Sequence, residues 1–96
     1  MANDFAHEPD AGRYTLRDGK ELLSNVDYRI NGNQISFHHT YTNPAHRGNG
    51  LAGKVVEFAI DDVEANTSYR ILPMCWYVGT WFDQHPERAG LLTRGA

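Results

Sequence analysis

Cysteine is nearly absent from this sequence, and its scarcity excludes two classes of protein. One cysteine, Cys75, occurs among 96 residues, so the chain can form neither an internal disulfide nor a Cys-rich zinc site. An excess of basic charge is also missing, because nine Lys and Arg residues stand against twelve Asp and Glu, for a net charge of −3. Nucleic acids and anionic membranes attract clustered Lys and Arg, so neither is expected as the main partner.

Long hydrophobic runs are missing as well. None approaches the ~20 residues of a membrane-spanning helix, and the first ten residues lack the apolar core of a signal peptide. We therefore expect a cytoplasmic protein. Hydrophobic residues make up 41% of the chain, with five Tyr, four Phe and two Trp, which is the composition of a folded protein. Its length fits one domain, with residues 1–11 as a loose acidic lead-in and residues 12–96 as the domain.

Turn signals and alternation predict an antiparallel meander of three strands over residues 12–17, 22–30 and 34–42. The turns are marked by Asp18-Gly19 and by Asn31-Gly32-Asn33. In the third strand, alternation places on one face Ile35, Phe37, His39 and Tyr41. It places on the other face Gln34, Ser36, His38, Thr40 and Thr42.

The second half of the chain predicts a crossover and a short final helix. Apolar residues recur at helical spacing from Ala52 to Val63, and Asn66 is a plausible end for this helix. A strand over residues 69–74 follows, and a right-handed crossover sets it parallel to residues 34–42. Residues 77–84 read as a short helix, stopped by His85-Pro86, with one further turn in residues 87–96. The fold class is α+β.

The segment between the third strand and the long helix is suited to binding an anion. Gly48 and Gly50 permit a sharp turn, so successive amides point outward where the helix dipole is positive. The Arg47 guanidinium can add a fork of donors for phosphate oxygens. The alternative is a loop whose glycines only ease the entry into the helix.

This segment, Arg47-Gly48-Asn49-Gly50-Leu51-Ala52, resembles the Q/R-x-x-G-x-G/A acetyl-CoA signature of the GNAT superfamily of N-acetyltransferases. Four further motifs fall in the order seen in small, single-domain GNAT-like proteins: His39-Thr40, Asn43-Pro44, Pro73-Met74-Cys75 and His85-Pro86. The resemblance covers roughly residues 13–93. It implies a minimal GNAT-like mixed sheet, with an antiparallel meander, one parallel strand, a long helix packed on it and a short C-terminal helix.

The resemblance also implies where acetyl-CoA lies. Backbone amides from Gly48 to Ala52 would hold the pyrophosphate. The pantetheine arm would follow the edge of strand 34–42, past Tyr41 and Thr42, where that strand splays from residues 69–74. The acetyl thioester would then lie near His39, Thr40 and Cys75, and backbone amides there would stabilise the oxyanion.

Two departures from the family pattern concern catalysis. Tyr41 stands where relatives often have an acidic residue, and Phe82 aligns with the tyrosine acid of larger GNAT enzymes, with Tyr77 nearby. His39 is then the leading base. Cys75 is either a nucleophile that carries the acetyl group or a small buried hydrophobe.

Two other groups of side chains have simpler interpretations. His38 and His39 would project from opposite faces of a strand, so no metal site is expected. An aromatic cluster of Trp76, Trp81 and Phe82 is expected in the core, with the acceptor cleft as the alternative. His85 reads as a helix-end residue.

The favoured function is transfer of acetyl from acetyl-CoA to an exposed amine, on a protein or a polyamine. The alternative is a CoA or acyl-CoA-binding module without efficient transfer, and a third possibility is a structural protein with no ligand. The acceptor, the acyl preference and the oligomeric state stay open at this point, with a monomer favoured.

Overall fold

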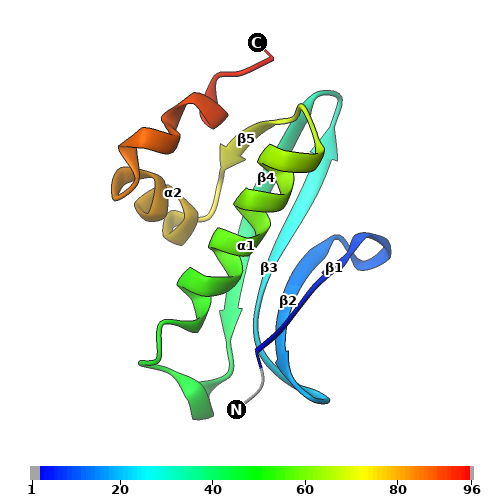
Figure 1. The fold of residues 1–96 in the computed structure, drawn as a ribbon, viewed down its shortest axis with the longest axis vertical. Coiled ribbons are helices and arrows are strands. Elements are labelled where there is room, and N and C mark those ends of the chain that lie inside the picture. The colour runs from blue at the N-terminus through cyan, green and yellow to red at the C-terminus, as the bar shows by residue number, and fades with distance from the viewer. Residues whose placement is uncertain (1–2, 96) are drawn as a thin grey trace.

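The computed structural model describes residues 3–95, which form one mixed sheet with helices beside it (Figure 1). The strands are β1 (Asp4–Glu8), β2 (Arg13–Asp18), β3 (Glu21–Asn31), β4 (Gln34–Thr42) and β5 (Arg70–Pro73). The α-helices are α1 (Leu51–Asn66) and α2 (Trp76–Asp83), and the 3-10 helices are η1 (Pro9–Ala11), η2 (Pro44–His46) and η3 (Pro86–Leu92). The strands lie in chain order, antiparallel from β1 to β4 and parallel between β4 and β5. The predicted α+β class, the meander and the parallel strand are confirmed.

The N-terminal segment corrects the expectation of a loose lead-in over residues 1–11. Residues 4–8 form β1, which pairs with β2 along its whole length. The ring of Phe5 stacks on Phe58 of α1 at 5.0 Å between centroids, and His7 stacks on Tyr14 of β2 at 4.2 Å. These ring contacts fix the first strand to the domain. Residues 1 and 2 of the predicted lead-in lie outside the described part of the chain.

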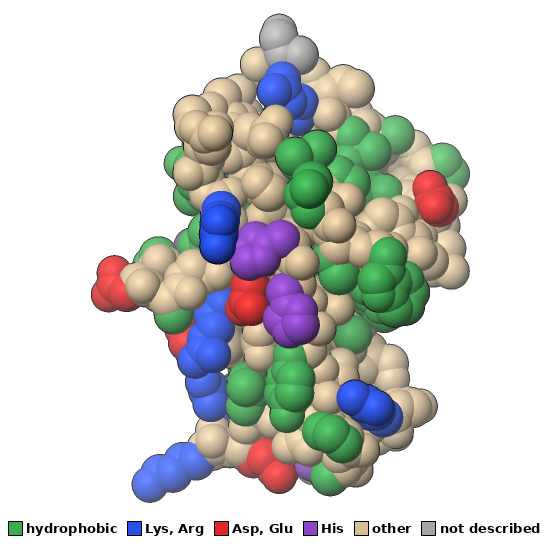
Figure 2. All heavy atoms as spheres, turned by 180° about the vertical axis from the view of Figure 1, so that it is seen from behind, with side chains coloured by type: hydrophobic (Ala, Val, Ile, Leu, Met, Phe, Trp, Pro, Cys, Tyr) green, Lys and Arg blue, Asp and Glu red, His purple; other side chains and the backbone are tan. Residues whose placement is uncertain are grey.

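Helix α1 covers one face of the sheet. Its buried residues recur three and four apart, as an amphipathic helix requires: Leu51, Val55, Val56, Ala59, Ile60 and Val63. They pack on buried side chains of the strands such as Tyr14, Val26, Ile35 and Phe37. Within residues 3–95 no helix covers the other face of the sheet, and Figure 2 shows charged and histidine side chains spread across it.

A polar network lies where β1, the sheet and α1 meet. The Tyr14 hydroxyl donates to Asp62 Oδ2 at 2.6 Å, and Asn66 Nδ2 donates to Asp62 Oδ1 at 2.7 Å. His7 Nε2 and the Tyr28 hydroxyl are 2.6 Å apart. Burial, then the hydrogen bond and charge of Asp62, raise the pKa of Tyr14 far above its ordinary value. The hydroxyl therefore stays protonated as a donor to the carboxylate.

A β-bulge in β4 overturns part of the predicted face assignment. Phe37 pairs with Tyr28 and His39 pairs with Asp27, so His38 is an extra residue with no partner on β3. Directly paired residues share a face, and the partners of Thr40 and Thr42 on β3 lie on the face covered by α1. Beyond the bulge, Thr40 and Thr42 therefore join the face of Ile35 and Phe37, and His39 and Tyr41 turn to the open face. The prediction that His39 and Tyr41 share the face of Phe37 is wrong.

The C-terminal third packs beside α1 and β5. Helix α2 buries Val78, Trp81 and Phe82, so the predicted short helix is confirmed. The prediction that Trp76 lies in the core with Trp81 and Phe82 is wrong, because 78% of the surface of Trp76 is exposed. His85 does follow the helix end, with Nδ1 2.7 Å from the Trp81 carbonyl and its ring stacked on that indole.

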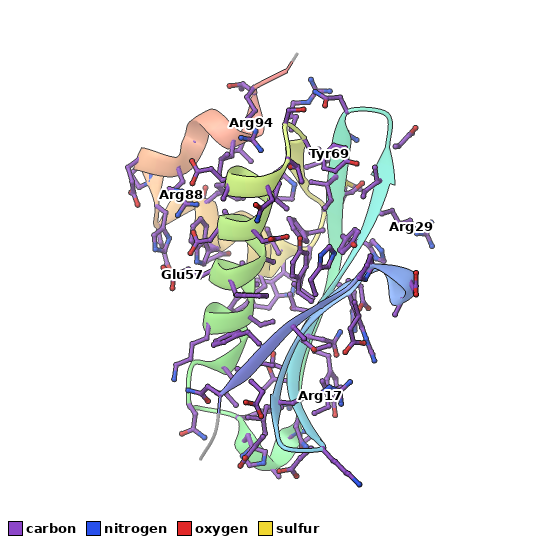
Figure 3. All side chains as sticks on the ribbon, turned by 45° about the vertical axis from the view of Figure 1, so that its right-hand side comes forward. Arg17, Arg29, Glu57, Tyr69, Arg88 and Arg94 are labelled. Carbon is purple, nitrogen blue, oxygen red and sulfur yellow. The ribbon has the colours of Figure 1, made fainter. Side chains whose placement is uncertain are left out.

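Two arginines tie the end of the chain to α1 (Figure 3). Arg88 of η3 forms ion pairs with Asp61 and Glu64 at 3.0 and 2.8 Å. Arg94 donates to the carbonyls of Val63, Thr67 and Tyr69 at 2.9, 3.0 and 2.8 Å. Arg94 therefore ties the C-terminal segment to the end of α1 and to the chain that leads from α1 into β5, beside the Thr67 amide and hydroxyl that also donate to the Val63 carbonyl. In the described part of the chain no helix combines the length and the apolar character that a membrane crossing requires.

Candidate functional site

The site begins where the parallel pair of strands separates. Strands β4 and β5 pair only from Gln34 to Phe37, and the amide of Cys75 closes the ladder by donating to the Phe37 carbonyl at 2.8 Å. The chain then turns into α2, while β4 continues to Thr42. Residues 38–42 consequently have no strand beside them on the β5 side within residues 3–95. Their main-chain groups on that side are available to an extended ligand.

A hollow of about 420 Å³ occupies this gap. Three segments line it: the end of β4, the turn into α1, and the first two residues of α2. The lining residues are Thr40, Thr42, Arg47, Gly48, Gly50, Leu51, Ala52, Trp76 and Tyr77. Most of the predicted cofactor-binding residues are therefore together on one wall.

The start of α1 forms the anionic end of the hollow. Gly50 precedes the helix with φ 69° and Gly48 has φ 90°, both in the left-handed region that favours glycine. The first helical hydrogen bond runs from the Lys54 amide to the Gly50 carbonyl. The amides of residues 51–53 have no hydrogen-bond partner in the described structure, and no side chain caps them. With Arg47 beside them, these amides suit a phosphate group.

Asparagine side chains hold the turn that leads into α1. Asn43 Oδ1 accepts a bond from the Ala45 amide at 3.0 Å, which starts η2. Asn49 Nδ2 donates to the His46 carbonyl at 3.0 Å. Asn49, predicted to bind the cofactor, does not line the hollow and instead braces the turn. Tyr41 was also predicted to bind the cofactor, but it faces the open side of the sheet and does not line the hollow.

The predicted catalytic residues are only partly brought together. Thr40 lines the hollow, and its Oγ1 is 3.6 Å from Cys75 Sγ. Cys75 is 9% exposed and lies behind Thr40, outside the lining. His39 lies on the opposite face of the sheet from Thr40, as the register shows, so it does not reach the hollow. His39 and the hollow are therefore on opposite faces of the sheet, unlike the expected arrangement, and the bulge at His38 is the physical reason.

Sequence reasoning gave too little weight to Trp76 and Tyr77. Both line the hollow, with their rings edge to face at 5.7 Å. Helix α1 has a glycine where Tyr77 approaches, since a Cβ added at Gly53 would lie 3.2 Å from the Tyr77 hydroxyl. Phe82, aligned with the family's acid, is buried in the core. The available signal was position, because both aromatic residues follow the end of a parallel strand, where ligands of α/β sheets bind.

The placement of the His, Cys, Asp and Glu side chains in the described part of the chain does not indicate a metal site. Among residues 3–95, no three His, Cys, Asp or Glu side chains gather closely enough to hold an ion. His38 and His39 are exposed on or beside the bulge.

The comparisons with known proteins agree with this geometry. Residues 13–91 match a family model described as GCN5-related N-acetyl-transferase. That range runs from β2 into η3 and contains every residue that lines the hollow. A search of curated proteins gave no match to the chain.

Proposed function

This chain belongs to the GCN5-related N-acetyltransferase family, and from that membership we propose that it transfers acetyl from acetyl-CoA to an exposed amine. The observation that carries the proposal is the start of α1. Three amides without partners and Arg47 meet there at one end of a hollow. The other end reaches Thr40 and the unpaired edge of β4.

The hollow fits the parts of acetyl-CoA in order. A pyrophosphate would accept hydrogen bonds from the amides of residues 51–53 and from Arg47. The amide groups of a pantetheine arm match the main chain of residues 38–42, in the way that an added strand would. Thr40 would then lie beside the thioester. When bound, acetyl-CoA supplies the carbonyl that an amine attacks and the thiolate that leaves.

The residues of the chain limit how protons can move. Tyr77 lines the hollow, with its hydroxyl beside Gly53 of α1, and is our candidate to protonate the leaving thiolate. Among the described residues no His, Asp or Glu lines the hollow, so the attacking amine would lose its proton to water. Activity should therefore rise with pH toward the ordinary pKa of an alkylamine, near 10.

Cys75 has a supporting role in this proposal. Its sulfur lies behind Thr40, with one weak hydrogen bond to that hydroxyl. Direct transfer from acetyl-CoA to the amine needs no covalent step at this buried thiol. A Cys75→Ser variant should keep at least half of the parent turnover. Loss of turnover, with an acetylated protein trapped in the parent, would favour the nucleophile instead.

The deciding experiment combines binding and turnover. Calorimetry with CoA should show binding at one site, and NMR titration should move the amide resonances of residues 51–53. Thiol release from acetyl-CoA should then depend on added amine. If CoA neither binds nor moves those resonances, the proposal fails.

A CoA-binding module without efficient transfer is the second candidate. One observation favours it: Phe82 lies in the core where an acid was expected, and the hollow has no base of its own. Binding of CoA without amine-dependent thiol release would select this candidate.

A further inference from the structure

Gly53 is a glycine that the backbone of α1 does not require. It is the third residue of the helix, and its φ lies outside the left-handed region. A glycine within a helix makes the fold less stable than an alanine at the same place. Gly48 and Gly50, just before the helix, have positive φ, so their backbone accounts for them. Gly53 needs a different explanation.

The explanation lies on the neighbouring helix, α2. A Cβ built on Gly53 would lie 3.2 Å from the Tyr77 hydroxyl, closer than the 3.4–4 Å of ordinary van der Waals contact. An alanine here would therefore push the phenol away from α1. Gly79 and Gly90 also lack a positive φ, but a Cβ on either meets no described atom within 4 Å. Among these three glycines, Gly53 is the one whose missing side chain makes room for another residue.

Tyr77 is held in place by its other contacts. The residue is half-buried and packs on the hydrophobic core, and its ring lies edge to face with Trp76 at 5.7 Å. Its hydroxyl bonds to no other residue within 3–95, and the oxygen is open to solvent. Because Tyr77 also lines the hollow, this hydroxyl is free to donate to a ligand there.

The first turn of α1 is a favourable place for the charge that Tyr77 would acquire. The amides of residues 51–53 lie in this turn without partners. In the proposed reaction Tyr77 gives its proton to the leaving thiolate, so negative charge forms on the phenol oxygen. The positive end of a helix dipole favours such charge, and the effect falls off within the first turn. The separation between the phenol and α1 therefore bears on the rate.

We propose that Gly53 is a positioning residue, whose missing side chain admits the Tyr77 hydroxyl to the first turn of α1 and so sets where the proton is donated. The inference rests on the proposed function and adds the feature of α1 that places the acid. In the step concerned, the amine nitrogen bonds to the acetyl carbon and the carbon–sulfur bond breaks. The sulfur takes the proton of Tyr77. The phenolate regains a proton from water, which has received the one that the amine lost.

The test enlarges residue 53 while leaving the hollow as it is. Gly53→Ala adds one methyl group where the hydroxyl lies, and Gly53→Leu adds a larger side chain that helices accept well. Gly53 does not line the hollow, and both changes keep its amide. Gly79→Ala is the matched control, because Gly79 lies inside α2 with open space around it. The assay measures kcat at saturating acetyl-CoA with n-butylamine as acceptor, and calorimetry gives the Kd for CoA.

The expected result is a loss of kcat that depends on the Tyr77 hydroxyl. A reacting group misplaced by about 1 Å can cost about a hundredfold in rate, so Gly53→Ala should lower kcat by about threefold or more, and Gly53→Leu by more than that. Gly79→Ala should stay within about twofold of the parent, and the Kd for CoA should stay within about twofold in Gly53→Ala. In a Tyr77→Phe background the hydroxyl is gone, so adding Gly53→Ala should change kcat by less than about twofold.

Thermal melts separate a displaced acid from a damaged fold. Gly79→Ala should raise Tm by about 2–8 °C, as should Gly53→Ala in the Tyr77→Phe background, because each replaces a glycine within a helix without a clash. In the parent background Gly53→Ala should raise Tm by less, since the methyl group and the hydroxyl compete for one space. Should Gly53→Leu fail to fold, Gly53→Ala and its Tyr77→Phe counterpart decide alone.

Several outcomes would overturn the inference. Full kcat in Gly53→Ala, or an equal loss with and without the Tyr77 hydroxyl, would do so and leave the proposed function in place. An equal rise in Tm in both backgrounds would also do so, because the hydroxyl would then not compete for that space. Full kcat in Tyr77→Phe would remove the acid as well as its positioning residue. A parent that does not bind CoA, or binds it without transfer to any amine, refutes the proposed function itself.

Discussion

Replacing Gly50 by alanine tests the anionic end of the hollow. Gly50 has φ 69° and ψ 22°, and a Cβ built on it meets no atom within 4 Å. The change therefore adds no clash, and its cost is the backbone strain of an L-residue in the left-handed region, about 1–2 kcal/mol. In a domain of this size each kcal/mol lowers Tm by about 4–8 °C. We expect Gly50→Ala to melt about 4–16 °C below the parent.

The strain also has a functional consequence. The variant can relieve it by unwinding the first turn of α1, which would move the amides of residues 51–53 away from their common direction. A bound ligand at about 100 times its Kd stabilises the native state by about 2.7 kcal/mol, so saturating CoA should raise the parent Tm by about 11–22 °C. Most of that rise should be lost in Gly50→Ala.

Two controls separate strain from general damage, with the melting temperature measured with and without CoA. Asparagine tolerates the left-handed region better than alanine, so Gly50→Asn should melt above Gly50→Ala. Gly79 lies inside α2 with φ outside the left-handed region and open space around it. Gly79→Ala should gain about 0.5–1 kcal/mol and keep the CoA-dependent rise. The reasoning is refuted if Gly50→Ala matches the parent in both melts.

Three further changes follow from contacts in the structure. Tyr77→Phe should lower kcat about a hundredfold with Kd for CoA unchanged; an unaltered kcat would remove Tyr77 as the acid. Tyr14→Phe breaks the 2.6 Å bond to Asp62 and should cost about 1.5–3 kcal/mol in urea unfolding. The native pKa of Tyr14 is raised, so its contribution to stability is complete below the unfolded pKa of about 10. Above that pH the contribution falls as the pH rises. Stability of the Tyr14→Phe variant that falls equally steeply at alkaline pH would contradict this assignment. Arg94→Ala should remove the guanidinium bonds to the carbonyls of Val63, Thr67 and Tyr69, cost about 1–3 kcal/mol and speed amide exchange where α1 leads into β5; unchanged exchange would count against this role of Arg94.

Local patterns predicted most of the fold. The bounds of β4 were predicted as the structure has them, because alternation and the flanking turn residues are signals within the segment. The end of α1 at Asn66 and the parallel crossover to β5 were also predicted correctly from local patterns. Strand β1 was missed, since its sequence is short and polar and its order comes from ring contacts with residues far along the chain.

The site was predicted in part for the same reason. The turn from Arg47 to Ala52 has glycines whose spacing can be read directly, and most of it lines the hollow. The position of His39 could not be read, because alternation assumes an unbroken ladder and the bulge arises from how β3 and β4 pack. The approach of Tyr77 to Gly53 is likewise a contact between two helices that no local pattern encodes.

The unpaired residue of β4 also makes the chemistry of this wall a matter of register. A ladder without the bulge would pair His39 with Val26, so an imidazole and a phenol, from His39 and Tyr41, would take the places of two small hydroxyl side chains. Deleting His38 would instead remove the extra residue and keep both hydroxyl side chains where they are. A slip of one residue between β4 and β3 is thus the change that would supply the hollow with a proton acceptor without altering any amino acid.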